Sequence, residues 1–168
     1  GAMCVVEPGT IHLTTDSLWG TPLNDRMWKF AKKTSMEDLQ QEMDTWMALY
    51  NTPDAEQRAE AEKMLDSISE LANQRMMDAS HELYNENPDN ILGAMALEWL
   101  VQGDALSYSE LDSILKVAAP VITSYEPLQG MLEELRKAEA TSAGHPYVDI
   151  AGQWRSENGE LKDGKLSD

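Results

Sequence analysis

Cysteine, basic residues and long apolar runs are all scarce in this chain of 168 residues. The single cysteine, Cys4, excludes an intramolecular disulfide, a Cys-pair zinc site and a two-cysteine redox motif. Only 13 Lys and Arg stand against 30 Asp and Glu, a formal net charge of −17. That balance argues against nucleic-acid binding and against an anionic membrane surface. No apolar run approaches the ~20 residues of a membrane span, so we expect no direct membrane insertion.

The chain does contain enough apolar material for a packed core. Apolar residues make up 42% of it, including five Trp, five Tyr and ten Met, which excludes a disordered chain. Its length is typical of one domain. Gly1-Ala2-Met3 is typical of a protease-cleavage scar, so we expect the native N-terminus to be missing.

The middle of the sequence carries helical signals. Residues 23–50 have an apolar stripe that predicts one bent helix or two helices. Thr52-Pro53-Asp54 predicts the start of a long helix that runs to about Asn85 and buries a stripe including Leu71. A helix apolar on most sides, about Asn90 to Gln102, is expected at the centre.

Two shorter helices follow in the pattern. Ser107-Tyr108-Ser109-Glu110 is a capping box that opens the first, and Pro120 is expected to bend or end it. Ser124-Tyr125-Glu126-Pro127 begins the last. The lone glycines Gly93 and Gly130 are both expected to allow close helix packing.

Both ends of the chain are β-prone. Cys4-Val5-Val6 and the run Thr10 to Thr14 predict a small hairpin or a bulged strand, and Asp16 to Pro22 is predicted to be a loop. Near the C-terminus, Val148, Ile150 and Trp154 precede the hairpin-turn residues Ser156-Glu157-Asn158-Gly159, and Leu161 begins the return. Because isolated strand edges are unfavourable, we expect the two ends to pair within one chain or across a dimer, with frayed ends as the alternative.

These segments predict a mainly α fold, an antiparallel helical bundle of four to six helices with short β segments at both termini. The predicted divisions are a β stub of a preceding sandwich-like domain over 1–22, the helical bundle over 23–143, and an opening β-hairpin over 144–168. Since the hairpin has little to pack against, we expect the native polypeptide to continue beyond Asp168.

The order of the motifs resembles a known architecture. Glu7-Pro8-Gly9-Thr10-Ile11 and Gly20-Thr21-Pro22-Leu23-Asn24-Asp25 resemble the end of the N-terminal β-sandwich region of bacterial cell-envelope thiol–disulfide oxidoreductases of the TlpA/ResA kind. Asn87-Pro88-Asp89-Asn90, followed by Ala94-Met95-Ala96-Leu97, resembles their helical region. Gly144 to Ile150, with the later Asn158-Gly159 and Leu166-Ser167-Asp168, resembles the opening of their thioredoxin-like domain.

The resemblance implies a non-catalytic role for this chain. In that family a Trp-Cys-x-x-Cys motif follows the Leu-Ser-Asp element, and its two cysteines carry out disulfide exchange. This chain has no such motif, and Cys4 lies at the opposite end, so no catalytic residue is carried over. Most of the family's sandwich is absent as well, which makes the chain similar to the helical middle of a larger protein.

Few residues stand out as candidates for a site. No catalytic, cofactor-binding or metal-binding residue is assigned, because His12, His81 and His145 lack the spacing of zinc ligands. The carboxylate pairs Glu37-Asp38 and Glu133-Glu134 are expected to be solvated.

Three residues are proposed for an interface. Trp19 and Trp154 lie outside the helices and are expected either to anchor a partner or to cover the end of the bundle. Cys4 is interpreted as a packed strand residue, with a reactive thiol or a lipid-acylated cysteine as alternatives. A Met and Trp stripe is interpreted as core, with a ligand groove as its alternative; its members are Met43, Trp46, Met47, Met64, Met76, Met77, Met95 and Trp99.

Three function classes remain from the sequence. The first is an accessory helical domain of an envelope thiol–disulfide oxidoreductase that positions substrate, dimerises or spaces domains. The others are a free-standing acidic binding or scaffold protein and a lipoprotein ligand binder. The expected partners are the chain's own thioredoxin-like domain, a partner protein or a second copy, with no cofactor and no nucleic acid. The expected location is the periplasm or cell envelope, with a lipoprotein anchor as an alternative.

Overall fold

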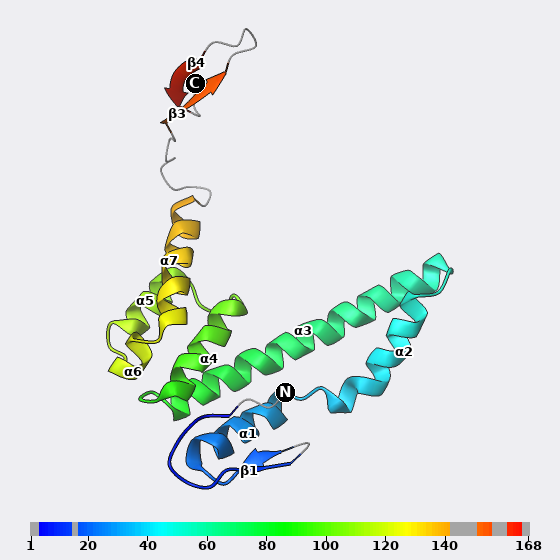
Figure 1. The fold of residues 1–168 in the computed structure, drawn as a ribbon. Helices are drawn as coiled ribbons and strands as arrows, with labels where there is room; N and C mark the ends of the chain where they lie inside the picture. Colours follow the sequence, from blue (N-terminus) through cyan, green and yellow to red (C-terminus); the bar gives the residue numbers. More distant parts are fainter. Residues whose placement is uncertain (1–3, 15–16, 142–150, 156–160, 166–168) are drawn as a thin grey trace.

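Helices dominate the protein, which confirms the predicted fold class (Figure 1). A computed structural model describes residues 4–14, 17–141, 151–155 and 161–165, the last two as backbone. Their elements are, in order, β1 (His12–Leu13), β2 (Leu18–Trp19), α1 (Pro22–Thr34), the 3-10 helix η1 (Glu37–Leu39), α2 (Gln40–Tyr50), α3 (Ala55–Glu86), α4 (Ile91–Gln102), α5 (Tyr108–Leu115), α6 (Pro120–Thr123), α7 (Glu126–Thr141), β3 (Ala151–Arg155) and β4 (Leu161–Lys165).

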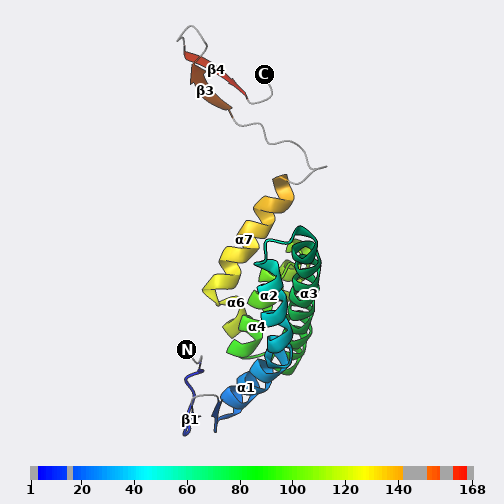
Figure 2. The same cartoon turned by 90° about the vertical axis from the view of Figure 1, so that its right-hand side faces the viewer.

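The 32-residue helix α3 packs against α1, α2 and α4, and α4 in turn packs against α6 and α7 (Figures 1 and 2). The N-cap of α3 is Asp54, whose carboxylate accepts hydrogen bonds from the amides of Glu56 (2.9 Å) and Gln57 (3.2 Å). The predicted start at Thr52-Pro53 was therefore two residues early, because Asp54 satisfies the free amides of the first turn. The predicted end near Asn85 is confirmed.

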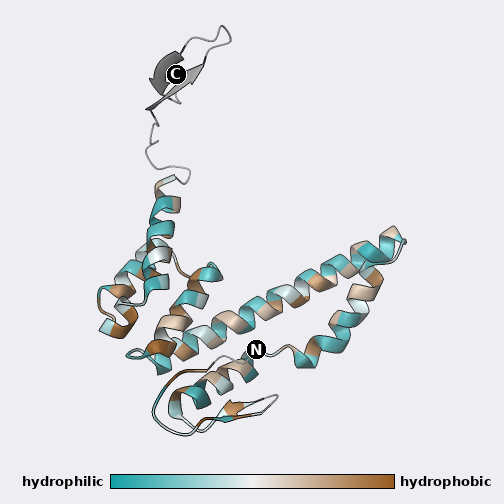
Figure 3. Ribbon diagram, in the orientation of Figure 1, coloured by the Kyte–Doolittle hydropathy of each residue, from teal (hydrophilic) through white to brown (hydrophobic). Residues whose placement is uncertain are grey.

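The core forms on both sides of α4. Leu97, Leu100 and Val101 pack with buried residues of α5, α6 and α7 in one cluster. Leu92 and Ala96 pack with buried residues of α1 and α3 in the other. The predicted central position of this helix is confirmed, and the hydropathy colouring of Figure 3 shows brown on α4 and around α6.

The two helical glycines differ in their surroundings. A Cβ on Gly93 would lie 2.0 Å from the carbonyl oxygen of Asn87, so α4 approaches the end of α3 too closely for any side chain there. A Cβ on Gly130 would meet nothing within 4 Å. The packing prediction is confirmed for Gly93 and wrong for Gly130.

The short helices follow their capping signals. The Ser107 hydroxyl accepts the Glu110 amide while the Glu110 carboxylate accepts the Ser107 amide (2.9 Å), which confirms the capping box. Pro120 neither bends nor ends α5, which stops at Leu115. Pro120 instead opens α6, since a proline at the first helical position loses no hydrogen bond.

The N-terminal region differs in part from its prediction. Residues 23–50 form two helices, α1 and α2, joined through η1, which confirms the second of the two predicted alternatives, while the β-prone segment before them differs from its prediction. Cys4-Val5-Val6 is not a strand, and the predicted loop from Asp16 to Pro22 contains β2, which pairs antiparallel with β1. The segment is held by side chains that the β-pattern does not reveal.

Asn24 and Glu7 make those attachments. The buried Asn24 side chain accepts from the Val5 amide and donates to the Val5 carbonyl, both at 2.8 Å. The Glu7 carboxylate accepts from the amides of Leu23 (2.8 Å) and Asn24 (3.1 Å), so it caps α1 from 16 residues away. Burial alone would raise the pKa of Glu7, but hydrogen bonds from Thr21 and from these amides outweigh it and leave the pKa below its ordinary value.

The C-terminal segment contains the predicted antiparallel strand pair, β3 with β4. Ala151 pairs with Lys165 and Arg155 with Leu161. Its turn at 156–159, together with Val148 and Ile150, lies outside the described residues. Among the strands that the structure describes, β1 pairs with β2 and β3 with β4, so these strands do not pair the two ends within one chain. Pairing of the ends across a dimer stays a prediction.

Candidate interaction surface

The three residues proposed for an interface belong to different parts of the described chain. Trp19 lies in the β1–β2 sheet, Trp154 lies in the β3–β4 sheet, and Cys4 lies in neither. Trp19 lies in β2, is 40% exposed and stacks on His12 with ring centroids 5.5 Å apart. Trp154 lies in β3, and its side chain is outside the description. Cys4 is exposed and in no strand, so its interpretation as a packed strand residue is wrong.

Neither histidines nor carboxylates gather into a metal site in the part of the chain that the structure describes. His12 stacks on Trp19, and His81 is exposed on α3. His145 falls outside the description. Across the described helices, none is long and apolar enough to cross a membrane.

The Met and Trp stripe lies at the edge of the core. Trp99 stacks on Phe30 with centroids 4.6 Å apart, and Met76, Met77 and Met95 pack against the two buried clusters. None of the eight members is fully buried, and Met47 is 48% exposed. The core interpretation holds only for the four members that pack against the buried clusters, Met76 and Met77 of α3 and Met95 and Trp99 of α4.

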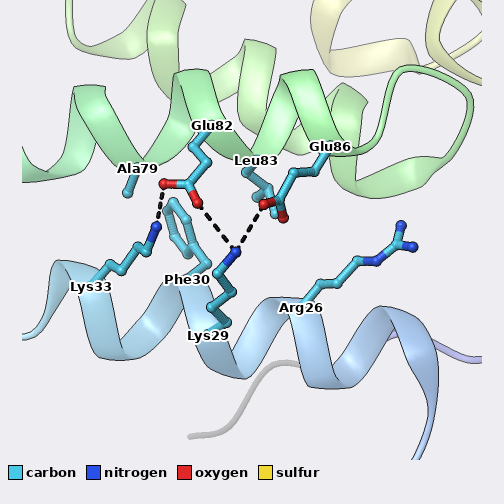
Figure 4. A pocket seen from close by; sticks show the side chains of 8 residues that line it. All are labelled: Arg26, Lys29, Phe30, Lys33, Ala79, Glu82, Leu83 and Glu86. Carbon is cyan, nitrogen blue, oxygen red and sulfur yellow. Dashed lines mark hydrogen bonds and ion pairs between the residues drawn. The ribbon is translucent and has the colours of Figure 1, made fainter.

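A basic helix covers the α4 end of α3 (Figure 4). The Lys29 ammonium lies 2.8 Å from the Glu86 carboxylate and 3.2 Å from that of Glu82, which Lys33 also contacts. Hydrogen bonds from Lys33 and Lys29 lower the pKa of Glu82. Phe30 lies between these ion pairs, and the cavity beside them measures only about 10 Å³, so the two helices are packed closely.

A larger cleft of about 810 Å³ opens at the elbow between α1, η1 and α3. Its lining residues are Trp28, Ala31, Lys32, Lys33, Ser35, Glu37, Asp38 and Arg75, without any of the predicted methionines. Arg75 donates to both carboxylate oxygens of Asp38 (2.8 and 2.7 Å) and to the Ser35 carbonyl (3.0 Å). The hydrogen bonds from Arg75 to the Asp38 carboxylate lower the pKa of Asp38. Together with the bond to Ser35, they fasten the turn before α2 to α3.

The outer half of α3 pairs with α2 to form a two-helix projection, the α2–α3 arm, which we define as residues 40–71 (Figures 1 and 2). The helix α2 has no buried residue. Met47 (48%), Tyr50 (41%) and Leu71 (42%) are large apolar side chains exposed on the arm. Leu71 was predicted to be buried, and that prediction is wrong because only one helix lies beside this part of α3.

Comparison with known protein families, with curated proteins and with solved structures found no match. The resemblance to envelope oxidoreductases therefore rests on the sequence motifs alone.

The sequence did not point to the contacts that shape this surface. Arg75 and Asp38 are 37 positions apart, and Glu7 is 16 from Leu23, so no local spacing indicates either pair. One sequence signal could have indicated the ion pairs of α1. The chain has only 13 Lys and Arg, and four of them fall in α1, which marks this helix as a partner for acidic side chains.

Proposed function

We propose that this chain is a non-catalytic helical interaction module that serves an envelope thiol–disulfide oxidoreductase by holding a protein segment near a thioredoxin-like domain. The exposed apolar residues of the α2–α3 arm are the observation that carries the proposal. A projecting arm whose helix α2 has no buried residue leaves apolar surface available to a partner. The motif resemblance supplies the redox setting.

The reading frame beyond residue 168 provides the first test. A Trp-Cys-x-x-Cys motif soon after this residue is the expected result, and a stop codon there would contradict the redox setting. It would favour the second candidate, a free-standing acidic binding protein, which the same arm and the net charge of −17 also support.

The protein encoded by the whole frame provides the second test. Replacing Met47 and Tyr50 by Gln should lower its kcat/KM for a protein disulfide by roughly 3–10-fold, because part of the substrate binding is lost. The rate of reduction of a small aromatic disulfide should be unchanged, because such a substrate cannot contact the arm and the redox-active cysteines at the same time. Equal loss with both substrates would contradict an accessory binding role.

A further inference from the structure

One half of α3 packs against two helices, α1 and α4, whereas the other half packs against α2 alone. At the α4 end, Ala79, Ser80 and Leu83 are buried beneath α1 and α4. In the α2–α3 arm, only Ala61 and Ile68 of α3 are buried, and α2 buries none of its own residues. Since two helices can shield only the seam between them, the arm has the apolar surface of a bundle without the helix that would complete it.

Apolar side chains on α2 have the spacing of one helix face. Met43, Trp46, Met47 and Tyr50 fall at i, i+3, i+4 and i+7, which places them along one side of the helix. All four are half-buried or exposed. Methionine side chains are flexible and adapt to varied apolar partners, so this row suits an inserted helix face.

The arm is also strongly acidic. Residues 40–71 contain eight carboxylates and only two cations. Glu62 and Asp66 each follow a residue of the seam, Ala61 and Leu65, so they lie one turn apart along its border. Neither carboxylate takes part in an ion pair within the described chain.

The covered half of α3 shows which helix fits such a surface. There Glu82 and Glu86, also at i and i+4, meet Lys29 and Lys33 of α1, which are at i and i+4 as well (Figure 4). Between the lysines, Phe30 enters the apolar seam. The molecule therefore already covers one acidic, apolar stretch of α3 with a basic amphipathic helix.

We propose that the α2–α3 arm binds a basic amphipathic helix of a partner protein in the same manner. Apolar side chains of the partner would pack on the row that includes Met47, and Lys or Arg at i, i+4 would pair with Glu62 and Asp66. A second copy of this chain is a poorer fit, because it would bring eight more carboxylates to the same surface. This inference rests on the proposed role of the arm as a binding surface and specifies the partner's chemistry.

The test uses the full chain and a fluorescent synthetic helix of Leu, Lys and Ala, about 18 residues long so that it folds on binding. In this peptide, lysines are spaced at i, i+4 along one border of a face made of leucines. Anisotropy at about 0.15 M salt, where distant charges are screened, measures the dissociation constant. Both Met47→Gln and the double variant Glu62→Gln/Asp66→Gln should weaken binding roughly fivefold or more.

Matched variants away from the arm provide the controls. Val117→Gln removes another exposed apolar side chain, 86% accessible, and Asp89→Asn/Glu134→Gln removes two other exposed carboxylates. These should change the dissociation constant less than about twofold. Absence of binding, or equal weakening by arm and control variants, would overturn the proposal.

Self-association is the remaining outcome. Sedimentation of the chain without peptide should show a monomer, and a dimer lost in Met47→Gln would assign the row to a second copy and overturn the basic partner. The proposed redox function is decided separately, by the reading frame after residue 168, so failure here and failure there are distinguishable.

Discussion

Ser80 is the one buried side-chain hydroxyl without a hydrogen-bond partner among the described residues. It is completely inaccessible, on the face of α3 that joins the core. A polar group removed from water without a partner destabilises the folded state. The residue therefore weakens the packing at the α4 end of α3.

Replacing Ser80 by Ala should raise the free energy of unfolding by about 1 kcal/mol, because the unpaired hydroxyl is removed and Ala favours helix. Chemical denaturation measures the change. The control Ser67→Ala, on the exposed side of α3 where the hydroxyl donates to the Lys63 carbonyl, should stay within about 0.5 kcal/mol. A loss of stability in Ser80→Ala would indicate a partner such as bound water.

Leucines of equal size should differ sharply according to their position. Leu97→Ala should lower the free energy of unfolding by about 2–5 kcal/mol, because Leu97 is inaccessible in the main cluster. Leu71→Ala should cost less than about 1 kcal/mol, because Leu71 is 42% exposed. Urea denaturation of both variants checks the pair, and equal losses would mean that the arm is covered in solution.

At the scale of elements, the sequence predicts helices well where capping side chains are local. Asn90 caps α4 through the Leu92 amide, and the Ser107 box opens α5, both within a few residues. The attachment of Val5 to Asn24 joins positions 19 apart, so no local pattern indicates it. The same limit explains Leu71. The sequence places it correctly on an apolar stripe, but its exposure depends on how many helices pack beside it, and only α2 lies along this part of α3.

Glycines inside two helices provide a paired test of packing. Gly93→Ala should lower the free energy of unfolding by about 1–3 kcal/mol, because the new methyl would meet the Asn87 backbone. Gly130→Ala should raise it by about 0.5–1 kcal/mol, since the site is open and Ala favours helix. Thermal and urea denaturation should agree in sign, and a neutral Gly93→Ala would contradict the close approach of α4 to α3.

The cap that Glu7 provides for α1 should be lost in acid. Because the folded-state pKa of Glu7 lies below its ordinary value of 4.5, its stabilising effect is present above that pH. As the pH falls through the lower folded-state pKa, the effect disappears. Wild type should therefore exceed Glu7→Gln in stability at pH 7, and the gap should begin to narrow near pH 4.5 and close once the pH is below the folded-state pKa.

Urea denaturation at several pH values measures this gap. Glu134→Gln, which removes an exposed carboxylate of α7, is the control for net charge. An identical pH profile for the two variants would show that Glu7 acts only as one of many negative charges.

For the whole molecule, one thiol limits the chemistry that the chain can perform. Disulfide reduction by a thioredoxin-type cycle needs an attacking and a resolving cysteine, and the chain has only Cys4. The purified chain should therefore show no turnover in an insulin reduction assay. Turnover that disappears in Cys4→Ser would contradict this prediction.

The 32 residues of α3 join two environments within a single run of backbone hydrogen bonds. Residues near Leu83 are fixed by neighbours on several sides, whereas those near Asp66 depend on α2 alone. Opening of the helix should therefore begin at its N-terminal end and spread inward, with amide exchange slowing progressively from Glu60 to Leu83. Slow and fast amide exchange would thus occur within one continuous helix, and the arm would unfold while the core remained folded.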